Sequence, residues 1–441
     1  MKWNPARRAL AALAAVALAA AAAVALLSLP WRADRPFSPP AVTGTAAGRG
    51  PLLAGLAVRP LELGPTPTIG GFPRWRWQAD GVRDQVGARA LLLEEPGARV
   101  ALVSVEILLI PEALDAAVRA RLADLGLDAL VLAATHTHAG PGGYWDSVAG
   151  RWGATGPYDP ATFARLADDV AAAVREAWAA RAPATLAVTR ARIEGLVRNR
   201  TGAEADGRLL VARLARPGGE PVAELVGFPA HATFLGKSNH LVSGDWPGRL
   251  MAAGARGPRI FFQGALGDQS VRLPPTSVSP GEAEPAAYAR LLGDSIDALE
   301  SGPVEPSPRL AVASAEVLLP PLGPGAVPAW LRPVARSLLG GLLPGTARVT
   351  AVRLGSLLLV ATPAEPVEAV GRAWRAAAGP GAELISLAGG YVGYVDTAAR
   401  FTSGAGEARR SYYGPALAER LEAAVAAAAR ATGAPPGSPQ R

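Results

Sequence analysis

Residues 100–135, VALVSVEILLIPEALDAAVRARLADLGLDALVLAAT, decide the fold class of this chain. Residues 100–110 form a nearly continuous apolar run, which is typical of a buried strand. Residues 111–125 follow with helical periodicity and a proline in the first turn. Residues 128–135 are apolar and strand-like again. A strand, a helix and a second strand predict an α/β fold, in which helices flank a single or doubled mixed β-sheet.

The same reading applies to the rest of the chain, where helical and strand-like patterns continue. Helices are expected over residues 160–182, 280–300, 366–378 and 414–432, and strands over 185–193, 209–214, 222–227, 260–263 and 347–361. We find no internal repeat in the sequence.

Composition excludes several classes of protein. Half of the 441 residues are apolar, which suits a large core. The net charge is +7, but the basic residues are spread along the chain, which argues against a nucleic acid partner. There is no cysteine, so disulfides, thiolate metal sites and cysteine nucleophiles are excluded, and a metal would need His, Asp, Glu or Tyr.

The N-terminus predicts export. Lys2, Arg7 and Arg8 precede an apolar run over residues 9–29, about the ~20 residues that span a bilayer. Residues 1–30 are therefore expected to be a transmembrane signal anchor with the remainder outside the cytoplasm, periplasmic or extracellular. The alternative is a signal peptide whose cleavage releases a secreted protein. A linker over 31–54, a catalytic domain over 55–432 and a disordered tail over 433–441 complete the expected organisation.

The four histidines fall in two short segments rich in glycine and proline. His136 and His138 follow the apolar strand of residues 128–135, so they are expected on one face at its carboxyl end, where open α/β sheets bind ligands. Two imidazoles so placed suit a metal or an acid/base pair. His231 and His240 lie in the second segment, and His231 follows another strand-like run. It is expected to meet the first pair, although a zinc site needs one or two further ligands.

Seven motifs occur in the order seen in neutral/alkaline non-lysosomal ceramidases, and the chain resembles the N-terminal catalytic domain of that family. They are His136-Thr-His138-Ala-Gly-Pro-Gly-Gly, Asn199-Arg200-Thr201, Asn239-His240-Leu-Val-Ser with Asp245, Gly267-Asp268-Gln-Ser270, Pro363-Ala-Glu365 with Gly371-Arg372, Tyr391-Val-Gly-Tyr394, and Tyr413-Gly414-Pro415.

The resemblance implies a site and a role for each of its residues. Zn²⁺ would be held by His136, His231, Glu365 and Tyr394, with Tyr391 close enough to exchange places with Tyr394. The catalytic residues would be Ser270, His138, Arg200 and Tyr391. Whether Ser270 attacks covalently or only binds substrate stays open. Gln269 stands where the family usually has valine, and Val271-Arg272 replace its usual Pro-Asn.

The family also suggests a function. We expect a zinc-dependent amidohydrolase that cleaves the N-acyl bond of ceramide-like lipids to a sphingoid base and a fatty acid, near the membrane that its N-terminal helix enters. The alternatives are a zinc hydrolase for another N-acyl lipid, an ester or a peptide, and a non-catalytic envelope lipid-binding protein. The family's C-terminal immunoglobulin-like domain is expected to be missing. Residues 321–345, which include Trp330, are expected either to lie on a bilayer or to cover a loop. No oligomeric state is predicted.

Overall fold

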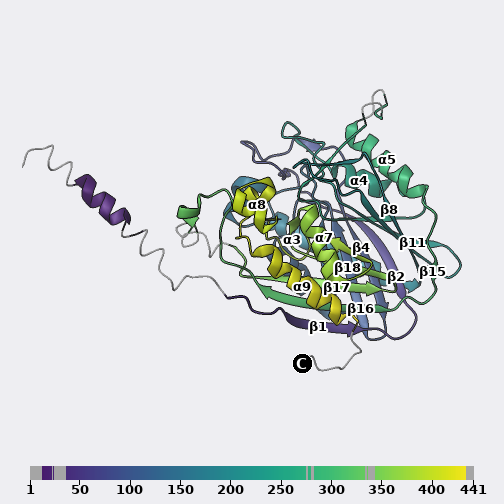
Figure 1. Ribbon diagram of the computed structural model, residues 1–441. Helices are drawn as coiled ribbons and strands as arrows, with labels where there is room; N and C mark the ends of the chain where they lie inside the picture. The colour runs from purple at the N-terminus through teal and green to yellow at the C-terminus, as the bar shows by residue number, and fades with distance from the viewer. Residues whose placement is uncertain are drawn as a thin grey trace, which may run out of the picture.

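The computed structural model describes residues 12–21, 23, 36–274, 277–279, 283–332, 335 and 343–433 (Figure 1). Residues 9–11, 22 and 24–29 of the expected membrane span and residues 434–441 of the expected tail lie outside these ranges. Among the described residues, no helix combines the length and the apolar character that crossing a bilayer requires. The apolar residues Leu338, Leu339 and Leu342 of the 321–345 segment are also outside them, whereas Trp330 in η4 (Ala329–Leu331) is exposed.

Three five-stranded mixed sheets form the body of the protein, which confirms the expected α/β class. The expectation of a single or doubled sheet was wrong, because apolar runs do not show which strands pair. The first sheet has the order β6 (Ala129–Ala134), β5 (Ala98–Val105), β4 (Gly87–Glu95), β2 (Leu53–Pro60), β7 (Ala182–Pro183). The second runs β13 (Arg259–Gln263), β11 (Pro221–Phe228), β10 (Arg208–Ala215), β8 (Thr185–Arg192), β15 (Val304–Glu305). The third runs β20 (Ala382–Ile385), β18 (Leu357–Ala361), β17 (Thr346–Leu354), β16 (Leu310–Leu318), β1 (Ala41–Ala47).

Each sheet pairs its strands in the same way. Three strands run antiparallel, a helix follows the third, and the next strand then pairs in parallel beside that third strand. The crossover helices are α2 (Glu112–Arg121), α4 (Asp245–Ala252) and α7 (Glu368–Ala378). A second helix follows each unit, namely α3 (Pro160–Ala179), α5 (Glu284–Asp297) and α9 (Leu417–Ala431). The expectation of no internal repeat was therefore wrong for topology, because a repeated strand order needs only a repeated apolar pattern and not repeated residues.

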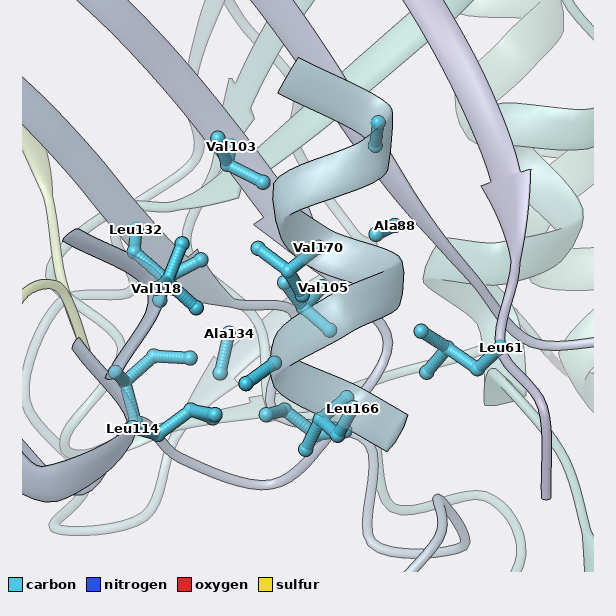
Figure 2. Close-up of a cluster of buried hydrophobic side chains, with 14 of the residues drawn as sticks. Leu61, Ala88, Val103, Val105, Leu114, Val118, Leu132, Ala134, Leu166 and Val170 are labelled. Atoms are coloured by element: carbon cyan, nitrogen blue, oxygen red, sulfur yellow. The ribbon is translucent and has the colours of Figure 1, made fainter. Parts of the chain in front are cut away.

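Helices cover one face of every sheet. Valine, leucine and alanine from α2 and α3 pack on the first sheet, and Figure 2 shows Val118, Leu166 and Val170 of these helices against its strands. The pair α4 and α5 packs on the second sheet, and α7 and α9 on the third (Figure 1). The opposite faces of all three sheets share one apolar cluster, which is the centre of the molecule. Burial on both faces explains why the strands read as apolar runs.

The N-terminal part of the domain differs from expectation. The stretch expected as a linker, residues 31–54, contains β1, which pairs antiparallel with β16 at the edge of the third sheet. Its sequence, AVTGTAA, lacks the long apolar residues that mark a buried strand, and its side chains are mostly exposed or half-buried. An edge strand is held largely by main-chain hydrogen bonds, which leave little trace in the sequence.

Shorter elements connect the sheets above the ends of their strands. Two-stranded pairs form between β3 (Gly81–Val82) and β12 (Leu241–Val242), β9 (Val197–Asn199) and β14 (Gln269–Val271), and β19 (Glu365–Pro366) and β21 (Tyr394–Val395). The remaining turns and helices are η2 (Ala123–Leu125), the π-helix η3 (Gly150–Ala154), α8 (Ala398–Ser403) and η6 (Gly406–Arg410).

Candidate metal centre

His136 and His138 lie just beyond the carboxyl end of β6. His136 adopts a left-handed backbone conformation with φ of 65°, which is uncommon for a residue with a side chain. The two rings consequently meet edge to face at 87°, with their Nε2 atoms 3.2 Å apart. The expectation that both project side by side from an extended strand end was wrong in its geometry. A turn brings them together, and the His136 amide holds it by donating to the Ile107 carbonyl.

Main-chain carbonyl groups orient all three clustered imidazoles. The Nδ1 atoms of His136, His138 and His231 lie 2.7, 2.9 and 2.9 Å from the carbonyl oxygens of residues Leu108, Gly71 and Gln269. A carbonyl oxygen only accepts, so each Nδ1 carries the proton. Each Nε2 of a neutral ring is then left with a lone pair, and these lone pairs converge.

A buried carboxylate completes the cluster. Oε2 of Glu365 lies 3.4 Å from Nε2 of both His136 and His231, and it has no hydrogen-bond donor. His231 follows β11 and Glu365 follows β18, so the donors come from the strand ends of three different sheets. The three histidine nitrogens lie within 4.8 Å of one another. Acceptors that face each other without donors need a cation between them, so this cluster could hold a metal ion.

Burial sets the charge state of these groups. The pKa of His138 is held well below its usual value by burial and by the neighbouring His136 and His231. Burial and the nearby Arg200 lower the pKa of His231 to about 4. For Glu365, burial would raise the pKa, but the adjacent imidazoles of His136 and His231 outweigh it and hold the pKa well below the usual value. The set is therefore two neutral imidazoles and a carboxylate, the protonation states that metal ligands need.

Two tyrosines contact the cluster in different ways. The Tyr394 hydroxyl lies 3.0 Å from Nε2 of His231, whereas the Tyr391 hydroxyl donates to Oε1 of Glu365 at 2.6 Å. Burial and the Glu365 charge raise the pKa of both. Tyr391 also packs edge to face against Trp145. The two tyrosines expected as alternative metal ligands thus lie in different positions. Tyr394 lies beside a histidine nitrogen, and Tyr391 orients the carboxylate.

Arg200 and Ser270 form the neighbouring part of the rim. Arg200 follows β9 and Ser270 belongs to β14, and these two strands pair with each other. Nε of Arg200 donates to Oγ of Ser270 at 2.8 Å. The guanidinium also contacts Glu407 at 3.3 Å and interacts with the Tyr394 hydroxyl. His136, His231 and Glu365 are buried, whereas Arg200 and Ser270 are half-buried. The structure thus places reactive side chains around the accessible side of a buried cluster.

Every residue expected in the site lies in or beside this cluster, but two residues of the motifs do not. His240 lies apart, where its carbonyl accepts from Asp80. Asp245 caps main-chain amides of Leu235 and Trp246, and its burial raises its pKa to about 6. Sequence reasoning missed the carbonyl groups that orient the imidazoles. A glycine pair at Gly70-Gly71 is the only sequence signal that could have pointed to one of them.

The fold and the cluster define a class: an α/β protein whose strand ends gather a buried histidine and carboxylate site fit for a metal. Comparison of the chain with known proteins points to a family. Residues 66–253 match the family model "Neutral/alkaline non-lysosomal ceramidase, N-terminal", so this stretch of the chain is similar to the N-terminal domain of that family. That stretch contains His136, His138, Arg200 and His231.

Curated relatives agree with this placement. Over 199 residues the chain is 29% identical to the neutral ceramidase of Mycobacterium tuberculosis, and over 195 residues 27% identical to that of Pseudomonas aeruginosa. Each match covers 40% of this chain, but only 31% and 29% of the relatives, so the matched part spans about a third of their length.

Solved structures show the same fold. The neutral ceramidase from Pseudomonas aeruginosa superposes with a TM-score of 0.70 over 86% of this chain and 74% of that chain. A ceramidase complexed with C2 gives 0.69 over 86% and 75%. Sequence identity is 21% in both cases, so this likeness concerns the fold alone.

Proposed function

We propose that the protein is a zinc-dependent amidohydrolase that cleaves the N-acyl amide bond of ceramide-like lipids. One observation carries the proposal: Nε2 of His136 and Nε2 of His138, 3.2 Å apart, converge with Oε2 of the buried Glu365, which has no hydrogen-bond partner. Ligands about 2.0–2.1 Å from a tetrahedral zinc ion lie about 3.3 Å apart. Oε2 of Glu365 lies 3.4 Å from Nε2 of both His136 and His231, and the Tyr394 hydroxyl lies 3.0 Å from Nε2 of His231, which suits such an ion.

Two sets of four ligands fit the geometry. His136, His231 and Glu365 belong to both, and the fourth position falls to Tyr394 or to His138. We assign it to Tyr394, because its hydroxyl lies within 3.0 Å of His231. His138 then remains free for proton transfer at the half-buried edge of the site. Zinc bound here would supply Lewis acidity toward the amide carbonyl and toward water.

The surrounding side chains support acyl transfer. Arg200 places a permanent positive charge beside Ser270, where the carbonyl oxygen of an amide gains negative charge during attack. His138, with Nδ1 fixed on the Gly71 carbonyl, presents its Nε2 to take or return a proton. Tyr391 keeps Glu365 in place through its hydroxyl. Ser270 either binds substrate or attacks it, and in the second case Arg200 would hold its oxygen in position.

The substrate class rests on the family. The relatives that match are neutral ceramidases, which supports a ceramide-like substrate for this chain. A different N-acyl lipid, an ester or a peptide would use the same residues. A non-catalytic envelope lipid-binding protein is the remaining alternative, and the donor-free cluster disfavours it, since binding a lipid needs no such arrangement.

We also propose that the catalytic domain lies outside the cytoplasm, held by the N-terminal apolar segment. Three basic residues before the run at 9–29 support this orientation. Protease added to intact cells should then digest the domain, whereas protection from protease would contradict the proposed side of the membrane.

The decisive experiment measures metal and activity together. We would purify the full chain in detergent, determine bound metal by mass spectrometry, and follow fatty acid release from ceramide. His231→Ala should lose both zinc and activity, while His240→Ala, outside the cluster, should keep both. Zinc without ceramide cleavage would point to another acyl substrate. A wild-type chain that binds no zinc would overturn the metal proposal.

A further inference from the structure

Two loops form a lip beside His138. Residues 73–77 come from the connection between β2 and β4, and residues 151–157 include most of η3. The Gly71 amide donates to the Ala154 carbonyl at 2.7 Å and joins the two loops, while the Gly71 carbonyl accepts from His138. Phe72 packs on the His138 ring at 4.8 Å between centroids. The tryptophan lip, as we call residues 73–77 and 151–157, is thus joined to the candidate site through Gly71 and Phe72.

Tryptophans dominate this lip. Trp75 is fully exposed and Trp152 is 78% exposed, which makes them the two most exposed tryptophans among the described residues. Together with Trp77 they line a cleft of about 610 Å³. An exposed tryptophan costs solubility and is usually covered in a soluble domain, but it is enriched where proteins meet the headgroup layer of a bilayer.

Basic residues accompany the tryptophans. Arg74 and Arg151 line the same cleft, and Arg76 and Lys237 lie beside it. Nη1 of Arg74 donates to the carbonyls of Lys237 and Asn239, but its Nε and Nη2 have no partner. The acidic neighbours are Asp80 and Asp146, which form exposed ion pairs with Arg76 and Arg151. Three arginines against two aspartates leave a positive surface, and exposed pairs hold their partners weakly.

We propose that the tryptophan lip docks the mouth of the site onto an anionic lipid bilayer. Trp75 and Trp152 would enter the headgroup layer, and the exposed side chains of Arg76 and Arg151 would meet lipid phosphates there. This contact is separate from the N-terminal segment and fixes the orientation of the domain, so that His138 and its neighbours face the membrane. The inference rests on the proposed function in one respect: it explains how a substrate dissolved in a bilayer reaches the site.

The chain contains no cysteine, which permits a direct test. Trp75→Cys and Trp152→Cys in the full chain each provide one thiol for an environment-sensitive fluorophore. Val304→Cys is the control, because Val304 is 62% exposed on β15 at the outer edge of the second sheet (Figure 1). Each labelled chain would be reconstituted into phosphatidylcholine vesicles with and without phosphatidylglycerol, some of them carrying a lipid-bound quencher.

Blue-shifted, lipid-quenched emission from positions 75 and 152 is expected in vesicles with phosphatidylglycerol, with water-like emission from position 304. Arg151→Gln should weaken the signal at position 75. Water-like emission at 75 and 152 in both kinds of vesicle would overturn the proposal, as would equal signals with and without the anionic lipid. No turnover is needed, so a chain that docks but releases no fatty acid would overturn the proposed activity and leave the docking proposal standing.

Discussion

At the scale of single residues, the site depends on the protonation of imidazole rings. Each of the three Nδ1 atoms is committed to a main-chain carbonyl, so the three Nε2 lone pairs are available before any metal arrives. Groups of this kind that support ligands usually matter almost as much as the ligands themselves. The tyrosines Tyr394 and Tyr391 allow this to be tested.

Tyr394→Phe and Tyr391→Phe should separate the two tyrosines. Removing the Tyr394 hydroxyl deletes a proposed ligand next to His231, so metal affinity should fall strongly. Removing the Tyr391 hydroxyl deletes only a hydrogen bond to Glu365, which should weaken affinity by roughly 10- to 100-fold. Competition with a chelator measures both. A larger loss of metal affinity in Tyr391→Phe than in Tyr394→Phe would mean that Tyr391 is the ligand and Tyr394 the supporting residue.

Glu106 gives a prediction about stability and pH. It follows β5, is almost fully buried, and its Oε2 has no hydrogen-bond partner. Burial raises its pKa to about 8, although Arg89 opposes the shift. Between a pKa of about 4.5 in the unfolded chain and about 8 in the folded one, the folded state binds more protons. Stability contributed by the protonated acid is therefore full at low pH and is lost as the pH rises through 8.

Glu106→Gln should remove this dependence, because a neutral amide of similar shape never has to carry a buried charge. The variant should be more stable than the wild type at pH 9, by on the order of a few kcal/mol, and should match it near pH 4, below the pKa of about 4.5 in the unfolded chain. Thermal unfolding at the two pH values measures the difference. If Glu106→Gln is more stable than the wild type by the same amount at both pH values, packing and not ionisation is responsible.

At the scale of elements, loops rather than strands set the geometry of the site. The sheets bring the chain to the right place, but His136 and His138 converge through a turn, and a loop from the β2–β4 connection holds His138. At Gly71 this loop lies directly against the main chain of His138. The φ of Gly71 is +111°, and a side chain there would put a Cβ only 2.1 Å from the His138 carbonyl oxygen.

Gly71→Ala should therefore move this loop and release the His138 ring from its acceptor. Activity should drop by roughly 10- to 100-fold, as is usual when a residue that orients a ligand is lost. Gly202→Ala is the matched control, since Gly202 also has positive φ, +78°, but open space around it. It should cost only roughly 1–2 kcal/mol of stability. Equal kinetic effects in the two variants would show that backbone strain, not the contact with His138, is decisive.

At the scale of the whole molecule, three units of the same strand and helix order share one core. Their strand ends meet at the candidate metal centre, which takes His136 from the first unit, His231 from the second and Glu365 from the third. Losing any unit would remove a ligand as well as a wall of the core. The third sheet is closed at its edge by β1, which comes from the opposite end of the chain.

A prediction about β1 follows. A chain that begins at Pro36 keeps this strand and should fold as the full chain does. A chain that begins at Leu53 lacks it and leaves the edge of β16 without a partner, so it should unfold at lower temperature and aggregate through the bare edge. Thermal midpoints and light scattering compare the two. Indistinguishable behaviour would show that β1 adds nothing to the stability of the third sheet.

Much of this protein could be predicted from the sequence, because the signals are local. Apolar runs and helical periodicity identified β5, α2, β6, α3, α7 and α9, since burial imposes a pattern on each segment separately. The clustering of histidines marked the site, and the motif resemblance added Glu365, Tyr394 and Arg200. β1, β2, β4, β16, β20 and α4 were missed, and the expected strand over residues 347–361 is two antiparallel strands, β17 and β18. Apolar runs do not mark where a strand turns, and a strand with small or mixed side chains has no clear pattern.

The sequence by itself thus determined the α/β class, many of the helices and strands, and the residues that meet in the candidate site. Only the tertiary structure decided that three sheets share one core, that ligands come from one strand end of each, and that carbonyl groups of Leu108, Gly71 and Gln269 orient the rings. The reason is physical. Periodicity reports whether a segment is buried, whereas the partner of each segment depends on packing between parts far apart in the chain, and a main-chain carbonyl is the same chemical group in every residue.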